Sequence, residues 1–229
     1  LRFGTCLLNP PSGYALGDLE LGKRFVSDLL AGETLRIEGS APWLAQAQLP
    51  QSEQARLTVH VGHAEREPSA DELLIYPRNV LVAVAGEVAD VSATIREALH
   101  QARIAVQSVA CLLAADSLMA NSALREAAHE LGVPLRFVSA ADAANELARQ
   151  AIANPVSIVG DEAIAIAVAD QPLDPSQIGR PRGRLAVIGL GPGAADLMVP
   201  AVKAELARAN DVLGYETYVR MAGPFRDDQ

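Results

Sequence analysis

The sequence predicts an α/β fold: a small domain built on a parallel sheet, followed by the first β-α-β portion of a second α/β domain. Two observations predict it. In the middle of the 229-residue chain, continuous apolar runs alternate with segments of helical periodicity, as in residues 79–86 followed by 90–103. Near the end, the apolar residues 185–188 lead into a glycine-rich turn at 189–193, which is typical of a buried parallel strand and its loop.

Residues 1–70 form a linker-like α/β region that precedes the first clear domain. Apolar residues recur at helical spacing from Leu16 to Leu30, and Gly32 is placed to end that helix. Residues 34–37 and 57–61 have the composition of short strands, and the polar residues 65–70 are interpreted as the connection to the next domain.

Two histidines in this region, His60 and His63, are candidate metal ligands. Residues three apart in a strand point to opposite faces, so the pair cannot hold one ion from a regular strand. We therefore expect both side chains to lie on a solvated surface.

Residues 71–170 are predicted to be the parallel-sheet domain, with right-handed crossovers between its strands. Residues 154–168 are ambiguous: Ile164, Ile166 and Val168 alternate as in a strand, whereas the alanine-rich composition favours a helix, which we adopt. The remaining elements are a strand at 79–86, a helix at 90–103, a strand within 106–115, a helix at 119–131 closed by Gly132, a strand at 134–138, and a helix at 140–150 capped by Ser139.

Residues 171–183 are rich in proline and glycine and are predicted to be a linker. Arg180, Arg182 and Arg184 make it locally basic. These arginines could contact substrate carboxylates, or they could be solvated side chains of a linker in an acidic chain.

The glycine-rich turn after residue 188 allows several interpretations. Gly189-x-Gly191-x-x-Ala194 fits the dinucleotide fingerprint, with Asp211 or Glu216 as the ribose-binding acid. In that fingerprint the helix opens directly from the glycines, whereas Pro200 predicts a helix that starts there and runs to residue 209. The sequence lacks the Gly-Lys-[Ser/Thr] that ends a P-loop motif. The remaining alternative is a tight turn that binds no ligand.

Composition restricts the classes of partner. The formal net charge of −9 argues against nucleic acid or an anionic membrane, because both require a basic surface. Cys6 and Cys111 are too few for a disulfide framework and form no metal-ligand pair, so we predict no metal and a cytoplasmic location. No apolar run reaches 18 residues. No nucleophile motif occurs, so no catalytic residue is assigned.

Residues 184–229 resemble the opening of the tetrapyrrole methylase family, and their ending Gly214-Tyr215-Glu216-Thr217-Tyr218 is similar to the precorrin-3B methyltransferase branch. The resemblance implies methyl transfer from S-adenosylmethionine to a tetrapyrrole or corrin precursor, and it is compatible with a homodimer formed through this domain. Ala194 and Val199 depart from the family pattern, the latter where a capping threonine is common. The residues implied to bind the methyl donor are Gly189, Gly191, Pro192 and Gly193.

Residues 74–86, 110–116 and 130–140 resemble the C-terminal domain of the cobalt-precorrin-5A hydrolase family, enzymes that open a lactone and release a two-carbon fragment. The turn at 84–88 lacks the basic residue of that family, and Asp116 is kept without its basic neighbour. An anionic corrin precursor would need such cations. We therefore expect an altered hydrolase-like domain that binds a corrinoid weakly or serves as a structural partner.

Together these observations predict a fragment of a bifunctional corrin-biosynthesis polypeptide, with residues 184–229 as a truncated methylase domain that is inactive alone. The fragment is expected because one β-α-β portion would leave a sheet face bare. The main alternative is a non-catalytic corrinoid-binding or scaffolding α/β module.

Overall fold

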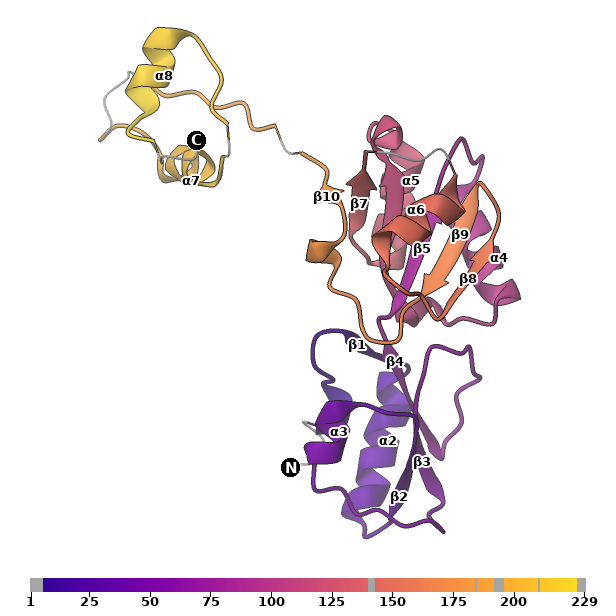
Figure 1. Cartoon of the computed structure of the whole chain (residues 1–229). Coiled ribbons are helices and arrows are strands. Elements are labelled where there is room, and N and C mark those ends of the chain that lie inside the picture. The colour runs from indigo at the N-terminus through magenta and orange to yellow at the C-terminus, as the bar shows by residue number, and fades with distance from the viewer. Residues whose placement is uncertain (1–5, 140–142, 184, 192–195, 210, 226–229) are drawn as a thin grey trace. The chain divides into compact units, whose positions relative to one another are not determined.

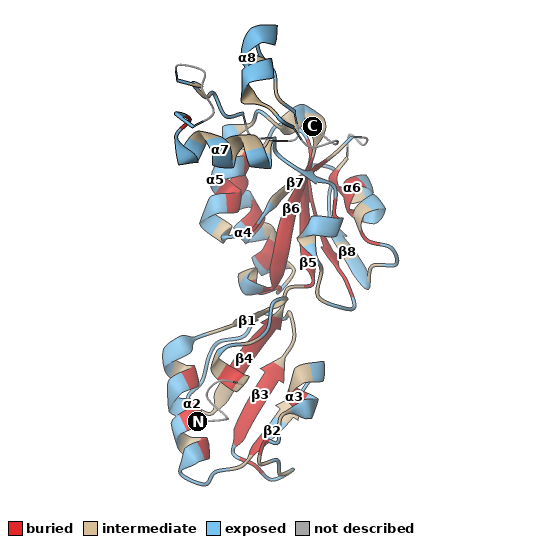
Figure 2. Cartoon of the chain, turned by 90° about the vertical axis from the view of Figure 1, so that its left-hand side faces the viewer, coloured by how far each residue is buried: buried red, intermediate tan, exposed pale blue. Residues whose placement is uncertain are grey.

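The computed structural model describes residues 6–139, 143–183, 185–191, 196–209 and 211–225. These residues divide into two compact units, 1–182 and 183–229 (Figure 1). The first unit contains two mixed sheets, so the predicted α/β class is confirmed. Buried residues follow the strands of these sheets, whereas α7 (Pro200–Arg208) and α8 (Glu216–Ala222) of the second unit contain none (Figure 2).

The first sheet has four strands in the order β1-β4-β3-β2. Strands β2, β3 and β4 are parallel, and β1 pairs with β4 in the antiparallel sense. Leu57 and Val59 point to the apolar side of the sheet, where they pack with Phe25 and Leu29 of a helix. The elements are β1 (Tyr14–Leu16), α2 (Leu19–Leu30), β2 (Leu35–Glu38), α3 (Pro42–Gln46), β3 (Leu57–Val61) and β4 (Glu72–Pro77).

Helix α2 starts later than the apolar spacing indicates. Leu16 belongs to β1, and the helix is capped at Asp18, whose carboxylate accepts a hydrogen bond from the Leu21 amide at 2.8 Å. After Leu30 the chain turns at Gly32, which has a φ of +108°. This left-handed conformation favours glycine, as predicted for the end of this helix.

The change from one sheet to the other occurs between β4 and β5 (Val80–Val84). Residues 65–70 are a connection, as expected, but they join two strands of the same sheet, since β3 and β4 pair in parallel. The expected domain boundary at residue 70 therefore falls inside the first sheet. Polarity alone did not distinguish a crossover loop from a link between domains.

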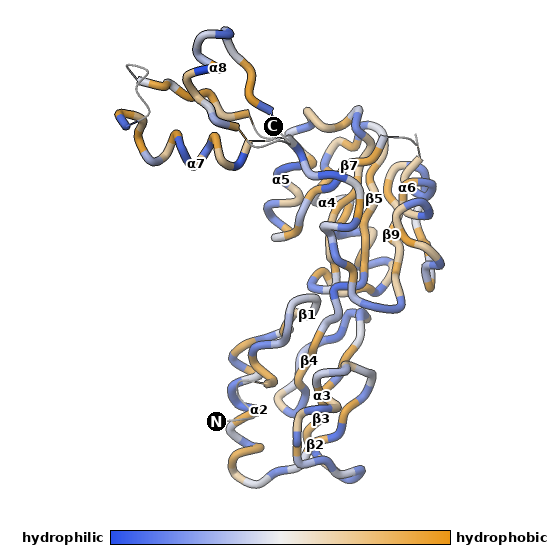
Figure 3. The backbone as a smooth tube through the Cα atoms, turned by 60° about the vertical axis from the view of Figure 1, so that its left-hand side comes forward, coloured by the Kyte–Doolittle hydropathy of each residue, from blue (hydrophilic) through white to orange (hydrophobic). Residues whose placement is uncertain are grey.

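The second sheet has six strands in the order β10-β7-β6-β5-β9-β8, and its inner strands are strongly hydrophobic (Figure 3). Strands β5, β6 and β7 are parallel, as predicted. The sheet is nonetheless mixed, because β8, β9 and β10 run antiparallel to their neighbours. Its further strands are β6 (Val109–Ala115), β7 (Leu135–Val138), β8 (Ser157–Gly160), β9 (Ile164–Val168) and β10 (Arg180–Pro181).

Helices α4 (Val91–Gln101), α5 (Ser122–Leu131) and α6 (Ala144–Ala151) connect these strands, together with short 3-10 turns at Val106–Ser108 and Asp116–Leu118. Helix α4 is capped by Asp90, and α5 ends at Gly132 in the left-handed conformation. Helix α6 has Ala143 at its N-cap without a side-chain bond, so the predicted cap at Ser139 is wrong. Residues 140–142 of that predicted helix lie outside the described residues.

The segment predicted as a helix at residues 154–168 is a β-hairpin of β8 and β9. Strand β9 pairs with β5 along its whole length, from Val80 opposite Val168 to Val84 opposite Ile164. All five residues of β9 are buried, since the strand lies between two neighbours inside the sheet. The alternation of Ile164, Ile166 and Val168 was therefore the correct signal, and the alanine content was misleading.

Residues 171–182, predicted as a linker, pack against the second sheet. Strand β10 pairs with the edge strand β7, and Ile178 is buried in the core. The Arg136 guanidinium donates to the carbonyls of Ile178 at 2.7 Å and Gly179 at 2.9 Å. A short 3-10 turn, Pro175–Gln177, is capped by Asp174. The segment is thus part of the first unit.

In the second unit, α7 (Pro200–Arg208) begins at the predicted proline, and α8 (Glu216–Ala222) follows. Of the residues described in this unit, only Met198 is buried. None of the helices in the described ranges is long and apolar enough to cross a membrane.

Candidate functional site

The glycine-rich stretch predicted as the cofactor site is only partly described. Gly189 and Gly191 lie in an irregular segment, and Pro192 and Gly193 lie outside the described residues. Residues 185–190 are not a strand, and the side chains of Leu185 and Val187 are 87% and 91% exposed. The expected buried strand is therefore wrong for this structure. A strand needs a hydrogen-bonded neighbour, and the described part of this unit contains no second strand.

The dinucleotide alternative also lacks its structural context. Helix α7 begins at Pro200, well beyond Gly191, and the described residues between them, 196–199, form no helix. Asp211 is in an irregular segment, and Glu216 pairs with Arg220 on α8. The described residues therefore bring neither acid to the turn. Gly191, with a φ of +66°, has the left-handed conformation of a tight turn.

A pocket that sequence reasoning did not predict lies on the polar side of the first sheet. It has a volume of about 180 Å³, and it lies where β2 ends at Glu38 and β3 ends at Val61. Parallel α/β sheets typically take their ligands at the carboxyl ends of the strands. Its lining residues are Glu38, Gly39, His60, Val61, Gly62, Ala64, Arg66, Leu74 and Tyr76.

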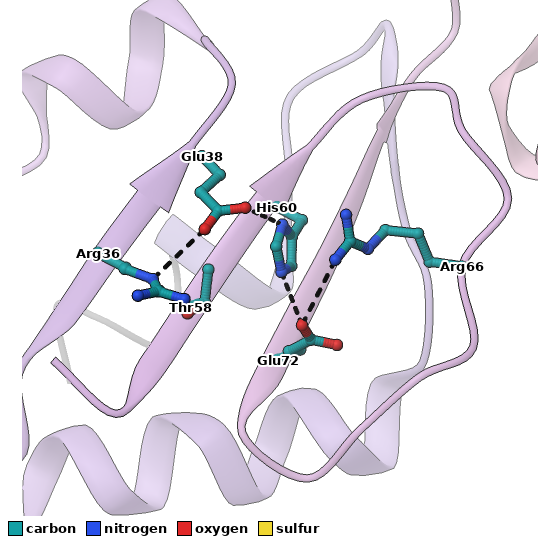
Figure 4. Close-up of polar contacts among 6 residues, drawn as sticks. All are labelled: Arg36, Glu38, Thr58, His60, Arg66 and Glu72. Atoms are coloured by element: carbon teal, nitrogen blue, oxygen red, sulfur yellow. Dashed lines mark hydrogen bonds and ion pairs between the residues drawn. The ribbon is translucent and has the colours of Figure 1, made fainter.

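His60 is the central side chain of this site, held between carboxylates from both neighbouring strands (Figure 4). Its Nδ1 atom lies 3.0 Å from Oε2 of Glu38, and its Nε2 atom lies 2.8 Å from Oε1 of Glu72. The residue is only 7% exposed. An imidazole nitrogen that carries a proton donates to a carboxylate, so the two glutamates fix the orientation of the His60 ring.

The strand register brings these three residues together. Glu38 is directly opposite His60 in the β2–β3 pair. Glu72 is opposite Thr58, two positions before His60, and therefore on the same side of the sheet. Side chains on one side of neighbouring strands are close enough for direct and diagonal contacts.

Two arginines complete the charge distribution. Arg36 Nε lies 3.4 Å from Oε1 of Glu38 and donates a 3.0 Å hydrogen bond to Oγ1 of Thr58. The Arg66 guanidinium is 3.6 Å from Oε1 of Glu72. The hydrogen bond with His60, above all, holds the pKa of Glu72 below its ordinary value, and the positive charges of His60 and Arg66 act in the same direction. The site therefore favours an ionised Glu72.

Glycines shape the rim of the pocket in two different ways. A Cβ on Gly39 would lie 2.0 Å from the carbonyl oxygen of Val61, and Gly39 has a φ of +94°. The closeness of the two chain segments therefore requires glycine at this position. A Cβ on Gly62 would meet no atom within 4 Å, so a larger residue there has room to extend.

The sequence prediction placed His60 on a solvated surface, and the structure corrects it. Its strand does alternate, with Leu57 and Val59 on the apolar side and Thr58 and His60 on the other. Both sides are shielded, however, and the carboxylates that contact His60 come from other strands. His63 lies beyond the strand and is half-buried, and burial lowers its pKa.

A second acidic position lies at the end of β6. Asp116, singled out in the sequence, receives the guanidinium of Arg180, whose Nη2 lies 2.7 Å from Oδ2. Of the three linker arginines, Arg180 is thus placed on a carboxylate of the chain itself. Arg182 is exposed, and Arg184 lies outside the described residues.

Residues 85–171 match the family model "Cobalamin synthesis G C-terminus". The match begins just after β5 and includes α4, β6, α5, β7, α6 and the β8–β9 hairpin. It covers less than half of the chain, and the His60 pocket lies outside it.

Curated relatives match over a short segment. Proteins named "Cobalamin biosynthesis protein CobIJ" from Mycobacterium bovis and from two strains of Mycobacterium tuberculosis are 51% identical over 37 residues, which is 16% of this chain. The aligned segment spans 7% of the length of those proteins. Among solved structures, a cobalamin biosynthesis protein G homologue from Sulfolobus solfataricus aligns with a TM-score of 0.28 and 13% identity, over 74% of this chain and 60% of that one.

Proposed function

We propose that this chain belongs to a protein of cobalamin biosynthesis. The observation that carries the proposal is the family match of residues 85–171, which coincides with the hydrolase-like segment recognised in the sequence. The short match to proteins named for the same process supports it independently, since it comes from a separate comparison.

Within that function, we propose that residues 184–229 contribute the start of a precorrin methyltransferase that uses S-adenosylmethionine. The support is the motif itself: glycines at 189, 191 and 193 allow a ligand to approach the backbone closely. The substrate would be a tetrapyrrole or corrin precursor. The protein would be located in the cytoplasm, and it would form a homodimer through the methylase domain. The described residues of this unit expose Leu185, Val187 and Leu213, and a bound ligand or a partner subunit would cover such apolar surface.

Calorimetric titration of the protein tests the methyltransferase proposal. S-adenosylmethionine should bind with micromolar affinity, and Gly191→Leu should abolish binding. Gly183→Leu is the matched control, because a Cβ at Gly183 meets no atom within 4 Å and its φ is not in the left-handed region. Binding of NAD in place of S-adenosylmethionine would overturn the proposal.

A second candidate is a non-catalytic corrinoid-binding or scaffolding module, and one contact favours it for residues 85–171. The carboxylate of Asp116 is already engaged by Arg180, so the acidic group kept at the end of β6 is neutralised within the chain. An assay of lactone hydrolysis separates the candidates: turnover at a rate typical of enzymes, about 1–1,000 per second, would reject the non-catalytic role.

A further inference from the structure

The pocket beside His60 combines a charged rim with an apolar floor. Glu38, His60 and Arg66 supply the charges, while Leu74 and Tyr76, which pack together, supply apolar surface. A concave site of this kind, with a few convergent polar groups on an apolar lining, is typical of a small-molecule site.

The carboxylates of the site have closer partners than Arg66. Glu38 contacts Arg36 and His60, and Glu72 contacts His60 at 2.8 Å. Arg66 is the cation of the site with the longest contact to a carboxylate. Its closest carboxylate oxygen is 3.6 Å away, beyond hydrogen-bond distance, and its side chain is 45% exposed.

Arg66 therefore has N–H groups available to a ligand at the pocket. A guanidinium binds a carboxylate through two parallel hydrogen bonds, which gives both affinity and orientation. We propose that the pocket binds a short aliphatic carboxylate, with its carboxylate on Arg66 and its carbon chain against Leu74 and Tyr76.

The volume limits the size of the ligand. A cavity of about 180 Å³ is smaller than the roughly 300–1,000 Å³ of sites for drug-sized molecules. It corresponds to about six water molecules at roughly 30 Å³ each, which suits an acid of two to four carbons. The same chemistry could come from a free acid or from a carboxylate-bearing arm of a larger molecule whose body stays outside.

The hypothesis that the ligand is a free acid depends on the pocket alone. The hypothesis that it is a carboxylate arm of a tetrapyrrole depends on the proposed function as well. Titration of the ¹⁵N-labelled chain with propionate, followed by NMR, tests whether the pocket binds a free acid. The amides of Gly62 and Arg66 should shift in a saturable manner with propionate. Propionamide, which has the same shape without the charge, should cause no such shifts.

Two variants and their controls test the geometry. Arg66→Gln should weaken propionate binding about tenfold or more, because it removes a charge-assisted pair. Gly62→Leu should abolish binding by filling the pocket, since a Cβ there meets no atom of the chain. The controls are Arg96→Gln, on the exposed side of α4, and Gly183→Leu, and both should bind propionate as the parent chain does.

A second titration distinguishes the two sources. Uroporphyrin, which carries acetate and propionate arms, should compete with propionate and lose affinity in Arg66→Gln if the ligand is a carried arm. Propionate binding without uroporphyrin binding assigns the pocket to a free acid. Equal binding of propionamide, or unchanged propionate binding in Arg66→Gln, would overturn the proposal. Neither result would alter S-adenosylmethionine binding, so failure of this proposal and of the proposed function are distinguishable.

Discussion

Glu38 lies directly opposite His60 in the parallel pair of β2 and β3, and Glu38 Oε2 is 3.0 Å from His60 Nδ1. The same imidazole contacts Glu72 of β4 at 2.8 Å, so one side chain links three adjacent strands through ionic hydrogen bonds. His60 thus has a structural role in the first sheet as well as a position at the pocket.

Replacing His60 with alanine should destabilise the protein by about 1–3 kcal/mol, because the change removes the side chain that both carboxylates contact and leaves a space in a buried position. His100→Ala is the matched control. His100 also contacts a carboxylate, Glu65 at 2.9 Å, but its side chain is 72% exposed, so its loss should cost under about 1 kcal/mol. Urea unfolding of both variants measures the difference. An equal loss of unfolding free energy in the two variants would show that the His60 contacts stabilise the protein no more than a surface pair does.

The stability contributed by Glu72 should depend on pH. Its pKa in the folded protein is below the ordinary value of 4.5, mainly through the hydrogen bond with His60. The folded state therefore favours the ionised form, and this contribution is present above pH 4.5 and is lost as the pH falls through the lowered pKa. The gap in unfolding free energy between the parent and Glu72→Gln should shrink from pH 6 to pH 3. A gap that stays constant would contradict a lowered pKa of Glu72 in the folded protein.

Gly39→Ala should destabilise the protein more than Gly32→Ala. Both glycines have a positive φ, +94° and +108° respectively, so alanine pays a similar backbone penalty at either position. Only at Gly39 would the new Cβ also lie 2.0 Å from a carbonyl oxygen, that of Val61. The difference between the melting temperatures of the two variants therefore measures the destabilisation caused by this steric clash. Similar melting temperatures would show that the ends of β2 and β3 move apart without cost.

Much of the fold was predictable from local patterns, since β3 and the capped helix α4 coincide closely with their apolar periodicity. The β8–β9 hairpin was missed because its identity depends on the pairing with β5, which the local sequence does not contain. The His60 site was missed for a related reason: Glu38 and Glu72 are distant in sequence, and only the strand register brings them to one imidazole.

The two cysteines should differ sharply in reactivity. Cys111 is fully buried within β6, and burial raises the pKa of its thiol to about 12. Cys6 is half-buried, and burial raises its pKa as well. Because the thiolate is the reactive form, iodoacetamide should label Cys6 in the native protein and Cys111 only after unfolding. Peptide mass spectrometry measures both, and comparable native labelling of Cys111 would show that β6 opens readily.

Arg136 should be the residue that fixes residues 176–181 to the second sheet. Its guanidinium donates to the carbonyls of Ser176, Ile178 and Gly179, and the segment it holds contains the edge strand β10. Arg136→Gln removes these charge-assisted bonds from a half-buried position, so the amides of this segment should exchange hydrogen faster.

Arg180→Gln is the matched control for that experiment, because Arg180 lies in the same segment but bonds through an exposed side chain to Asp116. Exposed pairs of this kind contribute little, so exchange should stay near that of the parent chain. Hydrogen exchange measured by mass spectrometry compares the two variants. Faster exchange in Arg180→Gln than in Arg136→Gln would mean that the ion pair with Asp116, and not the Arg136 hydrogen bonds, anchors the segment.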